Sequence, residues 1–142
     1  MKKKTIKQIY AVIVFVVALA GGYICIEPFV DVVPQGKYEV QTMQPDMKEA
    51  DYQRAWCTPD FGKVEHVLYD GTRVDCLTKD YAIEFDFAKK WAESIGQSLY
   101  YAKMTNRVPA VVLILEKPSD MKYVKRIEKL ENGIKIFLIK TY

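Results

Sequence analysis

Three carboxylates are spaced so that they can gather on one face of a β-hairpin. Asp75 alternates with apolar residues in the segment RVDCL, and Glu84 and Asp86 alternate with isoleucine and phenylalanine in YAIEFDF. Successive side chains of a strand point to opposite faces, so Glu84 and Asp86 share one face, and Asp75 can join them from the neighbouring strand. Like charges gathered in this way repel one another and are costly to desolvate. A divalent cation would relieve both costs.

The chemistry that these acids suit is that of a hard metal ion. Mg²⁺ or Mn²⁺ takes oxygen ligands, and Mg²⁺ in proteins uses one or two carboxylates together with waters and phosphate oxygens. We expect Asp75 and Glu84 to be the ligands, and Asp86 to bind a second metal or to orient a water. Such a metal polarises a phosphoryl oxygen and activates a water for in-line attack. The alternative is that all three are ordinary solvated acids on an exposed sheet face.

A helix expected from about residue 88 to 105 follows the second strand directly and adds polar groups. Each residue advances about 100° around a helix, which predicts one polar stripe of Lys90, Ser94, Gln97 and Tyr101. The same arithmetic predicts an apolar stripe of Trp91, Ile95, Leu99 and Ala102. Lys89 lies about 100° from Lys90, so Lys90 is the better candidate to stabilise charge on a phosphate. Gln97 and Tyr101 would contact a DNA backbone or bound waters, or alternatively form a buried polar pair bonded to the sheet.

The set Asp75, Glu84-x-Asp86, Lys90 and Gln97-x-x-x-Tyr101 resembles the metal-dependent nucleases of the PD-(D/E)xK superfamily. Its Gln-x-x-x-Tyr element is similar to that of the RecB-like and resolvase-like branches. The wording GTRVDCL…AIEFDFAKKWAESIGQSLYYA also resembles a group of small bacterial proteins assigned to that superfamily, and the similarity runs from about Trp56 to the C-terminus. The resemblance implies a restriction-endonuclease-like core, hydrolysis of DNA, and catalytic roles for these residues.

One position departs from the motif of that superfamily. The usual pattern is acid-x-Lys on the second strand, and Asp86 stands here where lysine is expected. In some members the lysine has moved to the next helix, which Lys89 or Lys90 would represent. Two further acids are weaker candidates. Glu65 could extend the acidic cluster from the preceding strand, and Glu49 resembles, in position only, an acid that some members carry on their first helix.

Composition limits the other possibilities. The chain has 142 residues and a net charge of +3, and several lysines lie in its first seven residues. The remainder is therefore near neutral, which gives no strong electrostatic case for nucleic-acid binding. The single histidine, His66, has no second histidine to share a metal with. The sequence contains neither a credible serine–histidine pair nor a Gly-rich phosphate loop.

The N-terminus predicts a membrane-directed segment over residues 1–26. Four lysines precede an apolar run from Tyr10 to Ile26. Ala18-Leu19-Ala20 forms a small-x-small cleavage site, so the segment is either a signal peptide or an uncleaved anchor. Either way the lysines stay inside, which predicts a chain that is secreted or periplasmic, or anchored with its domain outside the cytoplasm. Residues 27–45 contain prolines and a glycine and are expected to be a linker.

The domain is expected over residues 46–142, with mixed α/β structure. Hydrophobic patterns and turn signals predict the order α-β-β-β-α-β-α-β. The elements are a helix at 46–57 with Asp46 as a candidate cap, strands at 63–69, 73–77 and 81–87, the helix at 88–105, a buried strand at 110–115, a helix after Pro118 and a strand at 134–139. The first three strands form a meander and the last two follow helical crossovers, which predicts a mixed sheet with helices on both sides.

Two cysteines remain in the domain, Cys57 at the end of the first helix and Cys76 in the second strand. Cys76 points away from Asp75, toward the face that a helix would cover. Outside the cytoplasm a disulfide between the two is expected, and it would contribute about 3 kcal/mol by closing a loop of about 20 residues. The alternative is two buried thiols.

Three classes of function follow. The first is a magnesium-dependent nuclease acting on DNA outside the cytoplasm. The second is a non-catalytic, membrane-proximal binding module with a nuclease-like fold. The third is an unrelated structural protein of the cell envelope. The full set from Asp75 to Tyr101 favours the first, whereas Asp86 and the near-neutral charge favour the second.

Overall fold

The structure is a computed structural model that describes residues 16–19, 22–25, 37–130 and 133–142. The chain divides into two units, Met1–Val30 and Asp31–Tyr142. In the first unit, strands β1 (Val16–Leu19) and β2 (Gly22–Cys25) pair antiparallel. The rest of the predicted membrane-directed segment, and most of the predicted linker, lie outside the described residues. None of the helices described is long and apolar enough to cross a membrane.

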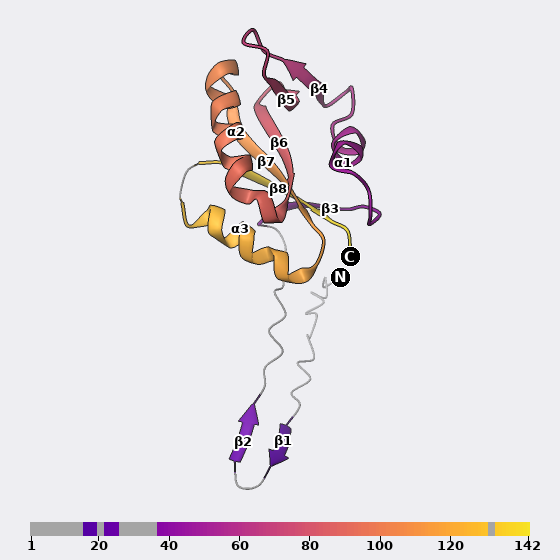
Figure 1. Cartoon of the computed structure of the whole chain (residues 1–142), viewed down its shortest axis with the longest axis vertical. Helices are drawn as coiled ribbons and strands as arrows, with labels where there is room; N and C mark the ends of the chain where they lie inside the picture. Colours follow the sequence, from indigo (N-terminus) through magenta and orange to yellow (C-terminus); the bar gives the residue numbers. More distant parts are fainter. Residues whose placement is uncertain (1–15, 20–21, 26–36, 131–132) are drawn as a thin grey trace, which may run out of the picture. The chain divides into compact units, whose positions relative to one another are not determined.

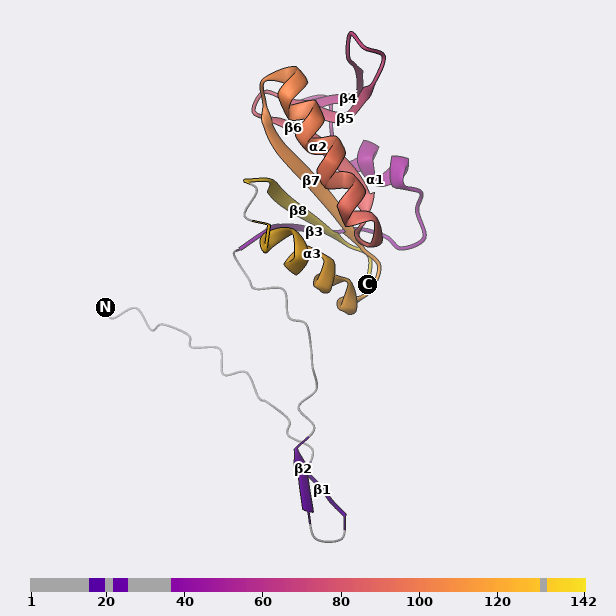
Figure 2. The ribbon, with the colours of Figure 1, turned by 60° about the vertical axis from the view of Figure 1, so that its left-hand side comes forward.

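The second unit is built on a six-stranded mixed sheet with the strand order β3-β8-β7-β6-β5-β4 (Figures 1 and 2). Strands β4, β5 and β6 form the predicted antiparallel meander, and β7, β8 and β3 join it in parallel. The elements in chain order are β3 (Glu39–Thr42), α1 (Glu49–Trp56), β4 (Gly62–Val67), β5 (Arg73–Thr78), β6 (Tyr81–Phe87), α2 (Trp91–Thr105), β7 (Val108–Leu115), α3 (Met121–Glu128) and β8 (Lys135–Lys140). Short 3₁₀ turns, η1 (Ala88–Lys90) and η2 (Pro118–Asp120), precede α2 and α3. The predicted mixed α/β class is confirmed, and the predicted element order is confirmed from α1 onward, with β3 as an additional strand before it.

Helices cover both faces of the sheet (Figures 1 and 2). On one face, Tyr52 and Trp56 of α1 pack with Ile83 and Phe85 of β6. On the other face, α2 and α3 lie over the sheet, and the buried cluster there includes Val111, Leu113, Val124 and Ile127. Burying each such side chain contributes about 1.5–3 kcal/mol. Strand β7 contributes alternate residues to both clusters, whereas β6 contributes Ile83 and Phe85 to the cluster on the α1 face.

Strand β7 is the centre of the core. Its residues from Ala110 to Leu115 are all fully buried, and both of its neighbours run parallel to it. A parallel strand covered on both faces needs apolar residues at every position, which explains the continuous run AVVLIL. This prediction from the sequence is confirmed.

The folded unit begins earlier than predicted. Glu39–Thr42 forms the edge strand β3, paired with β8, although the sequence had assigned this stretch to the linker. All four of its residues are exposed, so it lacks the alternation that identifies a strand. The prediction that Asp46 caps the first helix is wrong, because the helix begins at Glu49 and Asp46 has a left-handed φ of 60°.

Helix α2 meets the sheet through small polar residues. Ser94 and Ser98 are fully buried, and their hydroxyls donate to the carbonyls of Trp91 and Ile95 at 2.9 and 3.0 Å. Leu99, predicted on the apolar stripe, is 42% exposed. Serines bonded to their own helix leave no polar group unsatisfied and let the helix lie close to the strands. The apolar stripe expected from spacing is therefore wrong at Leu99.

A disulfide links Cys57, just after α1, to Cys76 of β5, as predicted. The two Cα atoms are 6.0 Å apart, and both residues belong to the cluster on the α1 face. This bond joins α1 to the strand that carries Asp75.

Candidate active site

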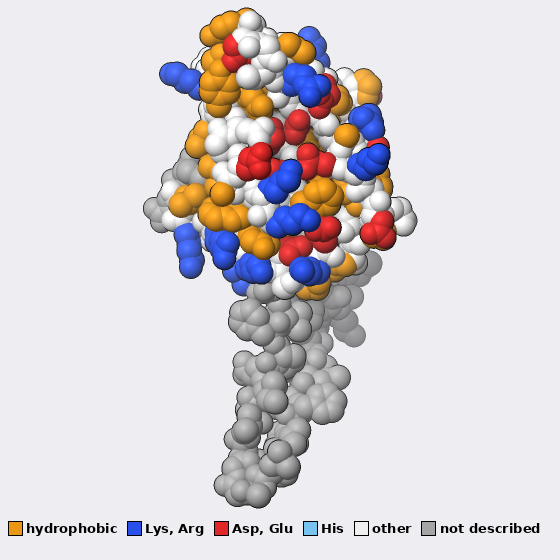
Figure 3. All heavy atoms as spheres, in the orientation of Figure 1, with side chains coloured by type: hydrophobic (Ala, Val, Ile, Leu, Met, Phe, Trp, Pro, Cys, Tyr) orange, Lys and Arg blue, Asp and Glu red, His pale blue; other side chains and the backbone are white. Residues whose placement is uncertain are grey.

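A polar pocket of about 410 Å³ is lined by residues of β5 and β6, of α1 and of one side of α2. All six residues predicted as catalytic line it, and both weaker candidates do so as well. The lining residues are Glu49, Glu65, Gly71, Thr72, Arg73, Asp75, Glu84, Asp86, Lys90, Glu93, Gln97 and Tyr101. In the surface view, acidic side chains gather near the middle of the face with basic side chains among them (Figure 3). Asp75 and Glu84 therefore converge rather than pointing to opposite sides of the sheet.

Asp75 replaces part of the ladder between the two strands. The backbones of β5 and β6 pair at two positions, Cys76 with Ile83 and Leu77 with Ala82. Beyond this pairing, the Asp75 Oδ2 atom accepts a hydrogen bond from the Phe85 backbone N–H at 2.8 Å. This leaves the other carboxylate oxygen available to the pocket. Burial raises the pKa of Asp75 to about 6, and the bond from Phe85 limits the rise.

Glu84 is the most strongly perturbed acid of the pocket. Its side chain comes from the middle of β6 and the residue is only 6% exposed. Its Oε2 atom is buried and has no hydrogen-bond partner among the residues that the structure describes. Burial, followed by the nearby charges of Asp75 and Asp86, raises the pKa of Glu84 to about 9. A buried carboxylate oxygen without a partner is costly, so this group is poised to bind either a proton or a cation.

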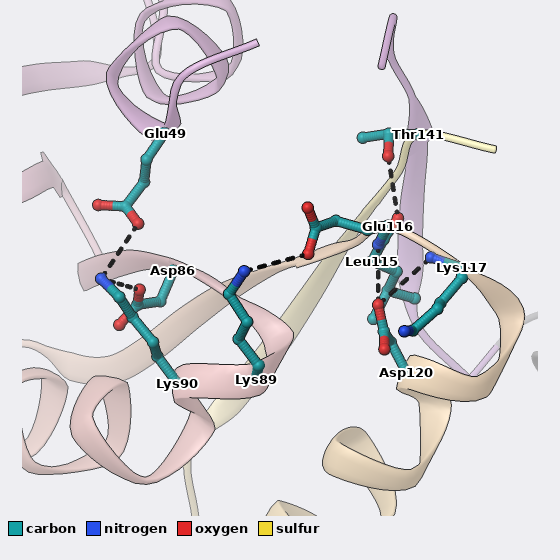
Figure 4. A network of polar contacts seen from close by, with 9 residues as sticks. All are labelled: Glu49, Asp86, Lys89, Lys90, Leu115, Glu116, Lys117, Asp120 and Thr141. Carbon is teal, nitrogen blue, oxygen red and sulfur yellow. Dashed lines mark hydrogen bonds and ion pairs between the residues drawn. The ribbon is translucent and has the colours of Figure 1, made fainter. Parts of the chain in front are cut away.

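Asp86 is paired with the first cation of the following helix. The Lys90 Nζ atom lies 3.0 Å from Asp86 Oδ1 and 3.7 Å from Glu49 Oε2 (Figure 4). Burial raises the pKa of Asp86 to about 7, although Lys90 opposes the rise. The pKa of Lys90 is raised in turn, chiefly through its bond to Asp86. The ammonium group at position 90 therefore reaches back to the strand position where the resemblance predicts a lysine.

Lys89 has different partners, which bears on the choice between the two lysines. Its Nζ atom lies 3.6 Å from Glu116 Oε2, at the end of β7, and it does not line the pocket. Figure 4 shows the two side chains leaving the same turn toward different acids, Lys90 toward Glu49 and Asp86 and Lys89 toward Glu116. The structure therefore brings Lys90, and not Lys89, to the acidic cluster.

Gln97 and Tyr101 lie one helical turn apart on the pocket side of α2. The Tyr101 hydroxyl donates to Gln97 Oε1 at 3.3 Å, and Tyr101 packs in a small buried cluster with Val74 and Ala82. Burial and the charges of Glu84 and Asp75 raise the pKa of Tyr101. Ser94, the remaining member of the predicted stripe, is buried beneath the helix and does not reach the pocket.

Glu65 and a residue missed in the sequence close the other side. Glu65 forms an ion pair with Arg73, at 2.7 Å between Oε2 and Nη1. The buried Gln53 donates from Nε2 to Glu65 Oε1 at 2.9 Å and to the Asp75 carbonyl at 2.7 Å. Gln53 holds the backbone of Asp75 in place, but no pattern in the sequence distinguished it from the other polar residues of α1. Glu93 and Thr72 were also missed.

The donor set can be compared with the needs of a hard cation. No group of three His, Cys, Asp or Glu side chains within the described part of the chain is already arranged to hold a metal ion. Mg²⁺ requires fewer protein ligands than this, because it keeps waters and binds phosphate oxygens. The unpartnered oxygen of Glu84 and the available oxygen of Asp75 fit that requirement.

Comparisons of the chain with family models, curated proteins and solved structures found no match.

Proposed function

We propose that this protein is a divalent-metal-dependent nuclease that hydrolyses phosphodiester bonds of DNA at the acidic pocket. The observation that carries the proposal is the buried carboxylate of Glu84. One of its oxygens is unpartnered, and the buried acid Asp86 lies nearby. A purely structural core has no use for such a group, because apolar residues would stabilise it more. A phosphodiester bound through a cation gives these acids a favourable partner.

The roles of the residues follow from their positions. Asp75 and Glu84 would hold Mg²⁺ or Mn²⁺, which when bound polarises a phosphoryl oxygen and lowers the pKa of a coordinated water. Asp86 forms an ion pair with Lys90 and would orient the attacking water. Lys90, whose side chain is 47% exposed, can turn its ammonium toward a phosphate oxygen and stabilise negative charge there. Gln97 and Tyr101 would position the substrate backbone.

We also infer a restriction-endonuclease-like core. The antiparallel meander, the crossover through α2 and the parallel strand β7 support it, as does the place of the acids on β5 and β6. Strand β8 continues the sheet on the side away from the pocket, and the additional strand β3 extends it further.

The place of action is proposed to be outside the cytoplasm, either after cleavage following Ala20 or with residues of about 10 to 26 kept as a membrane anchor. The Cys57–Cys76 disulfide supports this, since such bonds persist mainly in oxidising compartments. A C-terminal reporter that is active only in an oxidising compartment tests the proposal, and absence of signal would contradict it. The mass of the mature protein then separates cleavage from anchoring.

The nuclease proposal is tested with the purified full-length chain on single- and double-stranded DNA and on RNA, with Mg²⁺ or Mn²⁺. We expect Asp75→Asn and Glu84→Gln to abolish cleavage and to weaken metal binding in calorimetric titrations, with folding intact. Glu116→Gln is the matched control, because Glu116 is an exposed acid outside the pocket. If the wild type neither cleaves nor binds a divalent metal, the nuclease proposal fails and the alternative of a binding module takes its place.

A further inference from the structure

Two exposed tyrosines stand at the rim of the acidic pocket. Tyr69, in the turn between β4 and β5, is 91% exposed, and Tyr100, on α2, is 43% exposed. Their elements meet here, because the Tyr69 hydroxyl contacts Met104 Sδ at 3.9 Å, one turn along α2 from Tyr100. Aromatic rings are strongly apolar, so leaving two of them in water at one place calls for an explanation.

The ring of Tyr100 is held in a defined position. Its hydroxyl donates to Asp70 Oδ2, and Asp70 Oδ1 accepts from the backbone N–H and the hydroxyl of Thr72, at 3.0 and 2.7 Å. Asp70 therefore joins the turn to the helix through the tyrosine. A ring fixed in this way offers a flat apolar surface at little cost in conformational entropy.

This rim is continuous with the pocket. Gly71 and Thr72 of the same turn line the pocket, as does Tyr101. The rings of Tyr100 and Tyr101 are edge to face, with centroids 5.9 Å apart. A chain whose phosphate lay among Asp75, Glu84 and Lys90 would pass Tyr101 and reach Tyr100 next.

The charge of the pocket limits the kind of nucleic acid that can bind. Six acids line it, against only two cations, Arg73 and Lys90, and both cations are already paired with acids. Duplex binding depends mainly on many Lys and Arg contacts to phosphates, and the pocket lining supplies only Arg73 and Lys90. Single strands can bind instead through stacking of bases on aromatic side chains, worth about 1–3 kcal/mol per base.

We propose that Tyr100 and Tyr69 form a stacking platform for the bases of a single-stranded nucleic acid whose backbone enters the adjoining acidic pocket. This inference rests on the proposed function and assigns its substrate class. Bases inside a duplex are covered by their neighbours and cannot reach such a platform, so the platform selects single strands.

The test measures the anisotropy of a short fluorescein-labelled oligothymidylate with the full-length chain, in Ca²⁺, and compares it with a hairpin duplex of the same length. We expect the wild type to bind the single strand more tightly. Tyr100→Ala should weaken that binding about tenfold, as loss of one stacked base predicts, and Tyr69→Ala should weaken it less. Tyr100→Phe keeps the ring and should stay within about threefold of the wild type. Tyr142→Ala, which removes an exposed tyrosine from the end of the chain after β8, should have no effect.

The outcomes separate this inference from the proposed function. Cleavage of single and double strands at equal rates, unchanged by Tyr100→Ala, overturns the platform and leaves the nuclease standing. Ring-dependent binding of the oligothymidylate without any cleavage supports the platform and removes the nuclease. Equal binding by Tyr100→Ala and wild type, with circular dichroism unchanged, also overturns the platform.

Discussion

The Asp75 carboxylate occupies the place of a backbone hydrogen bond, since its Oδ2 atom accepts from the Phe85 N–H at 2.8 Å. One side chain thus satisfies a backbone amide of β6 beyond the last backbone pair of β5 with β6. The pocket that Glu84 lines lies at this end of the pairing.

This relationship predicts different effects for two variants of the same residue. Asp75→Ala should lower the free energy of unfolding by about 1–3 kcal/mol, because the Phe85 N–H loses its acceptor in a buried position. Asp75→Asn keeps an acceptor oxygen and should cost less than half as much, although it removes a proposed metal ligand. Urea unfolding measured without divalent ions checks this, and equal losses in the two variants would contradict the role of the bond.

The three raised pKa values predict how stability depends on pH without metal. The pKa of Glu84 rises from 4.5 to about 9, that of Asp86 from 3.8 to about 7 and that of Asp75 from 3.8 to about 6. Between the unfolded and folded values the folded state binds more protons, so its stability falls as pH rises across that window. Urea unfolding in EDTA should show this loss between about pH 4 and pH 9, with a shallower slope in Glu84→Gln.

Metal should reverse the trend, because only deprotonated carboxylates bind it. Adding Mg²⁺ or Mn²⁺ should raise the urea midpoint at about pH 8 and have little effect at about pH 4. Removal of the metal with EDTA should restore the pH dependence of stability measured without metal. A midpoint in Glu84→Gln that responds to metal as the wild type does would count against Glu84 as a ligand.

The disulfide gives a chemical prediction. Mass spectrometry of a non-reduced digest should recover the Cys57 and Cys76 peptides linked, and recovery of both as free thiols would refute the bond. Replacing both residues by serine should cost about 3 kcal/mol of stability, because the bond closes a loop with a sequence separation of 19.

Much of the fold and the acidic cluster could be predicted from the sequence because they rest on strong local signals. Asp70-Gly71 marks the hairpin turn, where Gly71 has a φ of 85°. Alternation in YAIEFDF placed Glu84 and Asp86 on one side of β6, and helical spacing placed Lys90 with Gln97. The turn depends on a local residue pair, and the other two signals depend on periodicities fixed by backbone geometry.

What was missed depends on contacts between distant segments. The exposed strand β3 has no pattern and is specified only by pairing with β8. Gln53 acts through the Asp75 carbonyl, 22 residues away. Leu99 was predicted to be buried, but the sheet selects the serines of α2 for close approach. Local propensity carries no information about such partners.

Two glycines differ in the space around them, so a substitution at Gly62, near the disulfide, can be compared with one at Gly96. A Cβ atom at Gly62 would lie 2.9 Å from Cys76 Sγ and from the Leu77 carbonyl oxygen, whereas one at Gly96, on α2, meets nothing within 4 Å. Gly62→Ala should therefore destabilise the protein by about 1–3 kcal/mol. Gly96→Ala should stabilise it by up to about 1 kcal/mol through helix propensity. Thermal unfolding of both variants measures these changes. If Gly62→Ala leaves stability unchanged, the disulfide and β5 can shift to make room for the added methyl group.

The neighbouring lysines test the catalytic assignment most directly. Lys90 contacts Asp86 and Glu49 in the pocket, while Lys89 pairs with Glu116 outside it, and both side chains are about half exposed. Lys90→Ala should slow cleavage about 10²-fold, the usual effect of removing one group that stabilises developing charge, whereas Lys89→Ala should stay near the wild-type rate. Because Lys90 lowers the pKa of Asp86, its loss should also move the acidic limb of the pH–rate profile to higher pH. If the two lysines had only structural roles, both variants would change in stability, and the acidic limb of the pH–rate profile would not move. Equal rates and equal pH profiles in the two variants would mean that neither lysine replaces the one expected at position 86.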